Sequence, residues 1–167
     1  YDVLLKAFGI VKKKVKNAKL IIVGDDQLPM QGLPAAKETA KELGIGSSVV
    51  ITGFKDAKFV RAAYQASHVF VHTADNEFQG LVSYEAAASR LPLCLSNIGS
   101  HTSVFKEHAF YHDVEDYEQL ARNILRCKER DATVHYNIRY LQEHMKSWDY
   151  EILKAKMHKH YDEVLNG

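Results

Sequence analysis

Two glutamates, Glu77 and Glu85, lie seven residues apart in the stretch DNEFQGLVSYEAAASRLPLCLS, which runs from Asp75 to Ser96. Between them lie Gly80 and the start of an alanine-rich segment that predicts a helix. The first amides of a helix have no acceptor within the helix, and the aligned peptide dipoles add partial positive charge there. A phosphate group is therefore a natural ligand at this point, and a glycine lets the backbone approach it closely.

The two carboxylates add a second kind of chemistry, the binding of hydroxyl groups. Glu85 is expected about one turn inside the helix, where its carboxylate can accept hydrogen bonds from two hydroxyls, as a ribose offers. Glu77 precedes the helix on a loop and can face a second polyol. The arrangement suits a nucleotide diphosphate sugar, with the diphosphate at the helix end, the ribose at Glu85 and the sugar at Glu77.

The same pattern has an ordinary structural explanation, which the spacing alone leaves open. The helix dipole favours a glutamate in the first helical turn whether or not a ligand binds. A glutamate on a loop is usually solvated, and a glycine before a helix is common. The wider sequence has to decide between the two explanations.

The bulk composition is that of a soluble globular domain. The 167 residues fit one domain with its own core, with 46% apolar and 26% charged residues. The net charge of +1 gives no global field that would favour nucleic acid or an anionic membrane. No apolar run approaches the roughly 18 residues needed to cross a bilayer. Cys94 and Cys127 lack metal-ligand spacing, so we expect buried, reduced thiols.

Strand and helix patterns alternate along the chain, which predicts an α/β fold with a doubly wound, Rossmann-like parallel sheet. Short apolar runs rich in β-branched residues predict buried strands at 18–24, 48–53, 68–73, 92–96 and 110–112. Helical patterns occupy 4–15, 35–43, the segments that Asp56 and Asp116 cap, 135–146 and 150–165. The chain opens inside an amphipathic pattern without an N-cap, so we expect one domain of a longer protein.

Ligands on such a sheet bind at the carboxyl ends of the strands. The loops at those ends are expected at residues 24–32, 53–56, 73–81 and 96–103. The loop that carries Glu77 is one of these four.

The stretch EFQGLVSYE, from Glu77 to Glu85, resembles the E-x7-E signature of the group 1 family of retaining GT-B glycosyltransferases. Other segments resemble the family in the same order, namely KLIIVGD at 19–25, ELGI at 42–45, VVITGF at 49–54, ASHVFV at 66–71, SNIGSH at 96–101, DYEQLA at 116–121 and SWD at 147–149. The resemblance covers nearly the whole chain. It implies that residues 1–167 form one nucleotide-sugar-binding domain, the C-terminal half of a GT-B fold, without the N-terminal acceptor domain and the first strand.

The resemblance also implies roles for single residues. Glu77 would be the catalytic residue and would contact the hydroxyls of the donor sugar, while Glu85 would hold the ribose. The amides of residues 80–82 would hold the diphosphate, and Gly53 and Phe54 would border the base. The full donor-binding set would be Gly24, Gly53, Phe54, Phe78, Gly80, Leu81, Val82, Glu85 and His101.

The activity implied by the resemblance is the transfer of a hexose, with retention of its anomeric configuration, to a glycan, lipid or protein. The donor would be a UDP- or GDP-sugar, and neither a cofactor nor a metal ion is needed. The partners would be the nucleotide sugar and the protein's own N-terminal domain, not nucleic acid. A cytoplasmic location is expected, with contact to the inner face of the membrane through the absent domain left open. The isolated domain is expected to be inactive.

Three positions depart from the family pattern. Arg90 stands where a small residue, often glycine, is usual, Ser103 stands where a glutamate is common, and Gln79 occupies an aromatic position. These departures keep open a second interpretation, a non-catalytic glycosyltransferase-like subunit that supports a partner enzyme. A nucleotide-sugar epimerase of the same fold and a phosphoacceptor receiver domain, suggested by Asp25 and Asp26, are weaker alternatives.

The nine histidines give no metal-binding pattern. His158 and His160 are two residues apart on a predicted helix and point different ways. His72 lies near the carboxyl end of its strand and could line the site. For both His72 and His101, a structural or solvated histidine is the alternative.

Overall fold

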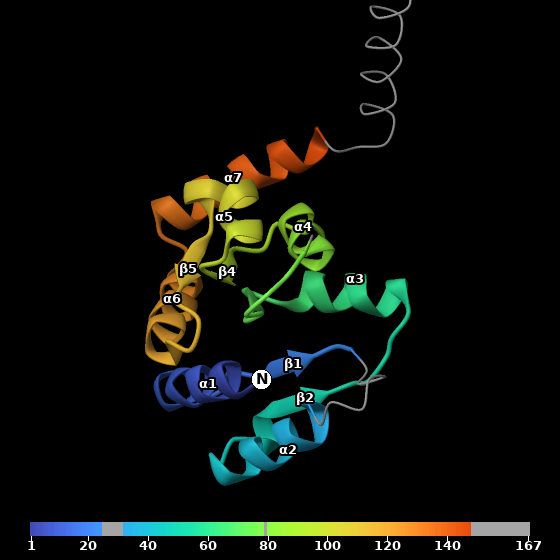
Figure 1. Cartoon of the computed structure of the whole chain (residues 1–167), viewed down its shortest axis with the longest axis vertical. Coiled ribbons are helices and arrows are strands. Elements are labelled where there is room, and N and C mark those ends of the chain that lie inside the picture. The colour runs from blue at the N-terminus through green and yellow to red at the C-terminus, as the bar shows by residue number, and fades with distance from the viewer. Residues whose placement is uncertain (25–31, 79, 148–167) are drawn as a thin grey trace, which may run out of the picture.

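The computed structural model describes residues 1–24, 32–78 and 80–147, and helices and strands alternate along them (Figure 1). The strands are β1 (Leu20–Ile22), β2 (Val49–Ile51), β3 (Phe70–His72), β4 (Leu93–Ser96) and β5 (Phe110–His112). The α-helices are α1 (Asp2–Lys14), α2 (Gly32–Glu42), α3 (Ala57–Ala66), α4 (Leu81–Ala88), α5 (Gly99–Phe105), α6 (Tyr117–Glu129) and α7 (Ala132–Lys146). Short 3-10 helices cover Gly46–Ser48 and Lys106–His108.

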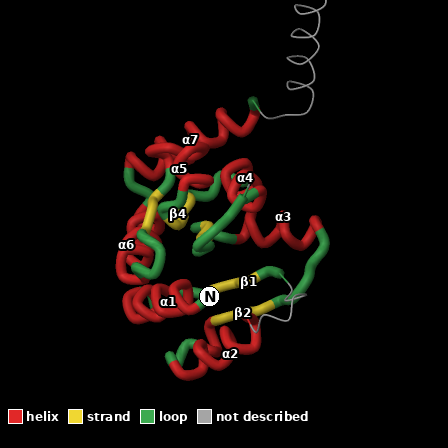
Figure 2. The backbone as a smooth tube through the Cα atoms, viewed as in Figure 1, coloured by secondary structure: helices red, strands yellow, loops and turns green. Residues whose placement is uncertain are grey.

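All five predicted strands are confirmed, and every pairing between them is parallel, as the α/β prediction requires. The described strands form two sheets rather than one: β1 pairs with β2, and β4 lies between β3 and β5. Figure 2 shows β1 and β2 side by side, apart from β4. The predicted parallel α/β fold is therefore confirmed, with its described strands divided between two sheets. The predicted helix at 150–165, the SWD segment beyond residue 147 and the acidic pair Asp25 and Asp26 lie outside the described residues.

Strand β4 is the centre of the larger sheet, and all four of its residues are buried. Because side chains alternate between the two faces of a strand, β4 contributes to two separate clusters. Leu93 and Leu95 pack with Phe105 and Leu141 on one side, whereas Cys94 belongs to the cluster on the other side. The strand is thus covered on both faces, as a doubly wound sheet requires.

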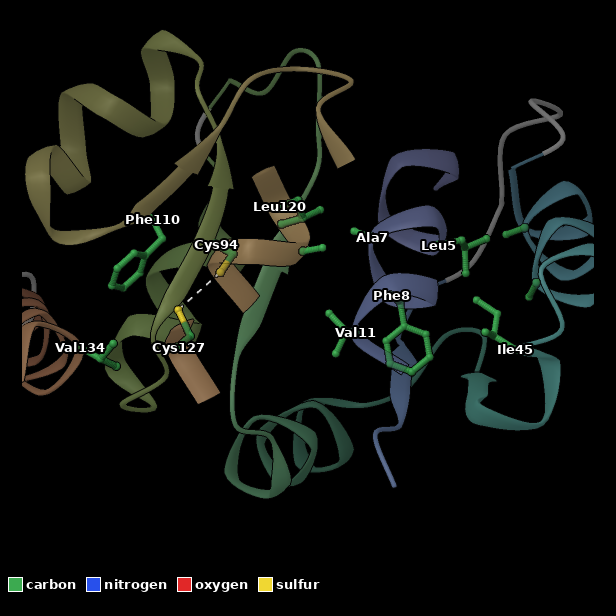
Figure 3. Packing of buried hydrophobic residues seen from close by; sticks show 13 residues of the cluster. Leu5, Ala7, Phe8, Val11, Ile45, Cys94, Phe110, Leu120, Cys127 and Val134 are labelled. Atoms are coloured by element: carbon green, nitrogen blue, oxygen red, sulfur yellow. Dashed lines mark hydrogen bonds between the residues drawn. The ribbon is translucent and has the colours of Figure 1, made fainter. Parts of the chain in front are cut away.

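The larger cluster joins the two sheets through α1, which packs against α6 (Figure 3). Phe8 and Val11 of α1 belong to the same buried group as Leu120 of α6. Cys94 and Cys127 belong to the same cluster, and their sulfur atoms are 3.6 Å apart. Both are buried free thiols, as the sequence predicted. Burial and the neighbouring thiol raise the pKa of Cys94, which keeps it protonated.

The strand predicted at 18–24 was expected to be buried, and this holds for Ile22 of β1 but not for Ile21. Ile21 is 39% exposed, and its register partner in β2, Val50, is also exposed. The reason is that the face of the β1–β2 pair carrying these side chains is left uncovered by the described residues. Helix α3 has a similar property, because its predicted apolar face, which includes Phe59 and Val60, contains no buried residue.

Local capping explains where several helices begin. The predicted caps are confirmed, since Asp56 accepts a hydrogen bond from the Phe59 amide and Asp116 from the Gln119 amide, both at 2.8 Å. Asp131 caps α7 in the same way. Each carboxylate satisfies an amide that has no acceptor inside its helix.

We expect Leu95→Ala to lower the free energy of unfolding by about 2–5 kcal/mol, because it opens a cavity at a fully buried position of the central strand. Leu43→Ala is the matched control, because Leu43 is 41% exposed and should lose about 1 kcal/mol or less. Urea unfolding of both variants measures the difference. Equal losses would show that β4 is not at the centre of the core.

Candidate functional site

Glu77 turns back onto its own loop at the entrance of α4. Its Oε1 atom accepts hydrogen bonds from the Phe78 amide at 3.0 Å and from the Gly80 amide at 3.1 Å. Gly80 is the N-cap of α4 and has a φ of 57°, in the left-handed region that favours glycine. A Cβ atom at this position would lie only 3.3 Å from Glu77 Cγ, so glycine also provides the space that the carboxylate needs.

Two histidines from different elements lie against this loop. His72, at the end of β3, has its Nδ1 atom 3.1 Å from Nε2 of His101 in α5. His101 is 1% exposed, and its Nδ1 atom is 3.0 Å from the carbonyl oxygen of Ser96. The other nitrogen of His72, Nε2, lies 3.8 Å from Glu77 Oε2. The structure therefore places Glu77 beside His72, which in turn contacts His101.

The pKa of His72 is lowered from its ordinary value. Burial, which disfavours the charged imidazolium, is the largest cause, and the neighbouring His101 adds to it. The carboxylate of Glu77 acts in the opposite direction, because it favours the positive charge. The net result is a His72 that is neutral at pH 7.

Glu85 lies on α4, one turn inside the helix as predicted, and Tyr64 of α3 orients it. The Tyr64 hydroxyl is 3.1 Å from Glu85 Oε2 and 3.1 Å from the carbonyl oxygen of Val82. Burial is the largest cause of the raised pKa of Tyr64. The negative charge of Glu85 and the hydrogen bond with Glu85 raise this pKa further, so the hydroxyl stays protonated. The sequence assigned Tyr64 only to the apolar face of a helix, and nothing in its local pattern indicates the contact with Glu85.

Gly24 and Gly53 come together at the carboxyl ends of β1 and β2, where the Gly24 amide donates to the Gly53 carbonyl oxygen at 3.2 Å. Gly53 has a φ of 69°, a conformation that glycine adopts without strain. Phe54 follows it and is largely exposed. These three predicted residues form one set, and the residues around Glu77 and Glu85 form a second set on the other sheet.

Some of the predicted donor-binding residues around α4 are exposed, whereas others are buried or hydrogen-bonded within the protein. Phe78 is 93% exposed, and Leu81 and Val82 are exposed at the start of the helix. The Gly80 amide is bonded to Glu77, so it would have to exchange that partner to bind a diphosphate. His101 lies beneath Gly80, where a Cβ atom on the glycine would be 3.7 Å from His101 Nε2. In this arrangement His101 reaches a ligand only through His72 or the loop.

Across the described ranges, no group of three or more histidine, cysteine, aspartate or glutamate side chains is arranged to hold a metal ion. Within the same ranges, no helix has both the length and the apolar character needed to cross a bilayer.

Residues 1–144 match the model of the family described as glycosyl transferases group 1. The chain belongs to this family. The match covers the described strands, the helices as far as residue 144 in α7, and the whole of the site described above.

The chain spans less than half the length of the proteins that it matches here. Over 90 residues, the sequence is 33% identical to alpha-monoglucosyldiacylglycerol synthase from Streptococcus pneumoniae, a match that covers 54% of this chain and 20% of that protein. The fold resembles a glycosyltransferase from Rickettsia africae, with a TM-score of 0.81, 19% identity and coverage of 98% of this chain and 44% of that one. Anabaena HepE, solved in complex with UDP-glucose, gives a TM-score of 0.78 with the same identity and coverage.

The group 1 family resemblance places a small residue, often glycine, where Arg90 stands, and the backbone accounts for that preference. Arg90 ends α4 with a φ of 64°, in the left-handed region, and its amide donates to the Ala87 carbonyl oxygen. A residue with a Cβ atom in this conformation costs about 1–2 kcal/mol. Arg90 thus keeps the backbone geometry that glycine would adopt. Ser103 is exposed on α5, and its hydroxyl lies 3.5 Å from the Ser100 carbonyl oxygen.

We expect Gly80→Ala to lower the free energy of unfolding by about 1–2 kcal/mol, because it forces a Cβ atom into a left-handed conformation. Gly9→Ala is the matched control: Gly9 is inside α1 with open space around it, so alanine should stabilise the protein by about 1 kcal/mol. Thermal unfolding of the two variants measures the expected loss of stability in Gly80→Ala and the expected gain in Gly9→Ala. A stabilised Gly80→Ala variant would contradict the left-handed N-cap.

Proposed function

We propose that residues 1–167 bind the nucleotide sugar donor of a hexosyltransferase that retains the anomeric configuration of the transferred sugar. The observation that carries this proposal is the placement of Glu77 and Glu85 on either side of the left-handed Gly80 at the start of α4, in a chain of the group 1 family. The fold similarity to HepE, which was solved in complex with UDP-glucose, supports a nucleotide sugar as the ligand.

In this proposal, Glu85 accepts hydrogen bonds from the ribose hydroxyls, and Tyr64 holds its carboxylate in one orientation. The amides of Leu81 and Val82, in the first turn of α4, face the diphosphate, where the helix dipole adds positive charge. Glu77 accepts hydrogen bonds from the donor sugar. Gly24, Gly53 and Phe54 border the base.

The catalytic contribution of this domain is positioning and electrostatic stabilisation. The departing nucleotide diphosphate gains negative charge in the transition state, and amides already aimed at it lower the barrier without reorganisation. Glu77 fixes the orientation of the sugar, and orientation alone can account for several kcal/mol of a barrier. In this proposal, the acceptor is bound by parts of the protein outside residues 1–167.

Removal of the two carboxylates should have different effects in the intact protein. We expect Glu85→Ala to weaken nucleotide binding about ten- to a hundredfold, because charge-assisted hydrogen bonds contribute about 1.5–3 kcal/mol. Glu77→Ala should abolish sugar transfer while changing nucleotide affinity much less. Calorimetry with UDP, GDP and ADP and their sugars, together with a transfer assay, measures both effects.

Glu129→Ala provides the control, because this glutamate is exposed at the end of α6, away from α4. Unchanged transfer in Glu77→Ala would contradict the role of that residue. Nucleotide-sugar binding through Glu85 without any transfer in the unmodified protein would instead favour a non-catalytic binding subunit.

We also propose that, in the intact protein, a further parallel strand lies between β1 and β3. Within the described part of the chain, β1 pairs only with β2, and β3 pairs only with β4. Ile22 of β1 and Val71 of β3 nevertheless pack in one cluster with Leu4, so the two open edges belong to the same region. A strand inserted here would join the two sheets into one.

Hydrogen exchange of the intact protein tests this arrangement. If another strand is paired between them, peptides covering β1 and β3 should be protected as strongly as the central strand β4. Edge strands exchange faster because one row of their backbone groups lacks a protein partner. Fast exchange in β1 and β3 beside a protected β4 would exclude the additional strand.

A further inference from the structure

The hydrogen bonds around His101 determine which nitrogen atoms of the two histidines carry protons. The Ser96 carbonyl oxygen can only accept, so His101 Nδ1, at 3.0 Å, must donate. His101 is 1% exposed, and when the proton of its ring is on Nδ1, its Nε2 atom is the acceptor. His72 Nδ1, at 3.1 Å from that atom, must then carry the proton.

This assignment leaves a lone pair on Nε2 of a neutral His72, directed at the carboxylate of Glu77. The 3.8 Å between His72 Nε2 and Glu77 Oε2 is longer than a hydrogen bond, as expected for two acceptors that face each other. Protonation of His72 would place an N–H group at this point. The pair would then attract instead of repelling, and the contact would shorten into a charge-assisted hydrogen bond.

We propose that His72 is a positioning residue for Glu77: neutral His72 presents only an acceptor to Glu77 Oε2, whereas charged His72 donates to this oxygen. The inference rests on the proposed function, in which Glu77 accepts hydrogen bonds from the donor sugar. A second donor on the same oxygen competes with the sugar hydroxyl. Acid should therefore weaken the productive placement of the sugar before it disturbs the fold.

The groups that face His72 come from two elements besides its own strand. His101 of α5 lowers the pKa of His72, together with burial, and Glu77 of the loop before α4 raises it. Phe70, on the same strand, stacks on the His72 ring and is uncharged. Because the net shift is downward, the imidazole is neutral at pH 7 and gains its proton below about 6.5, the ordinary histidine value.

The proton positions can be measured without any activity assay. In the intact protein labelled with 15N-histidine, the ring shifts of His72 at pH 7.5 should show the form protonated at Nδ1. Glu77→Gln should lower the pKa of His72, because it removes the negative charge that favours the imidazolium. A His72 protonated at Nε2, or a pKa unchanged in Glu77→Gln, would overturn the inference.

The pH dependence of transfer supplies the second test. In the unmodified enzyme, kcat/KM for the donor should fall about tenfold per pH unit below the pKa of His72, as for a single titrating group. His72→Gln, which cannot take up the proton, should lack this decline. His68→Gln is the matched control, because His68 precedes the same strand and is exposed, and it should keep the decline.

The two tests separate the inference from the proposed function. An absence of transfer with every nucleotide sugar, together with the expected proton positions, would reject the function and keep the contact between His72 and Glu77. The same acid decline in His72→Gln and in the unmodified enzyme would reject the role of His72 while transfer itself remains.

Discussion

The site depends on one backbone conformation, the left-handed Gly80 at the start of α4. This conformation directs the Gly80 amide towards Glu77, whose Oε1 atom also accepts from the Phe78 amide. The carboxylate therefore closes the loop instead of extending into solvent. Any side chain at position 80 would meet Glu77 Cγ and the His101 ring. Glycine thus suits both the left-handed conformation and the limited space beside Glu77.

The two glutamates of the motif are supported in different ways, which suits different tasks. Glu85 lies on a helix and receives a hydrogen bond from Tyr64, whose raised pKa keeps it a donor. Glu77 lies on a loop that backbone amides close, and it faces a histidine whose charge changes in mild acid. The Tyr64 hydroxyl remains a donor to Glu85, whereas His72 becomes a donor to Glu77 only when it is protonated.

The same described residues combine a well-packed region with surfaces that are left open. Strand β4 is buried on both faces, and α1 packs tightly against α6. In contrast, the β1–β2 pair has an exposed face at Ile21, and α3 contains no buried residue. In the described chain, β1 and β3 also each have one unpaired edge. Within the described residues, apolar surface thus remains uncovered at both places.

The sequence by itself determined the features that depend on residues close together in the chain. Apolar, β-branched runs predicted the five strands, and aspartates such as Asp56 predicted helix starts, because strand patterns and caps involve only a few neighbouring residues. The spacing of Glu77, Gly80 and Glu85 likewise predicted a loop that leads into a helix, and collinear segments indicated the family.

Only the tertiary structure decided the contacts that give these residues their properties. The sheet register and the packing of α5 bring His72 to His101, and the packing of α3 on α4 brings Tyr64 to Glu85. Partners so far apart in the chain leave no local pattern, since their approach depends on how whole elements pack. The exposure of Ile21 has the same origin: a β-branched run indicates a strand, but its burial depends on what covers each face.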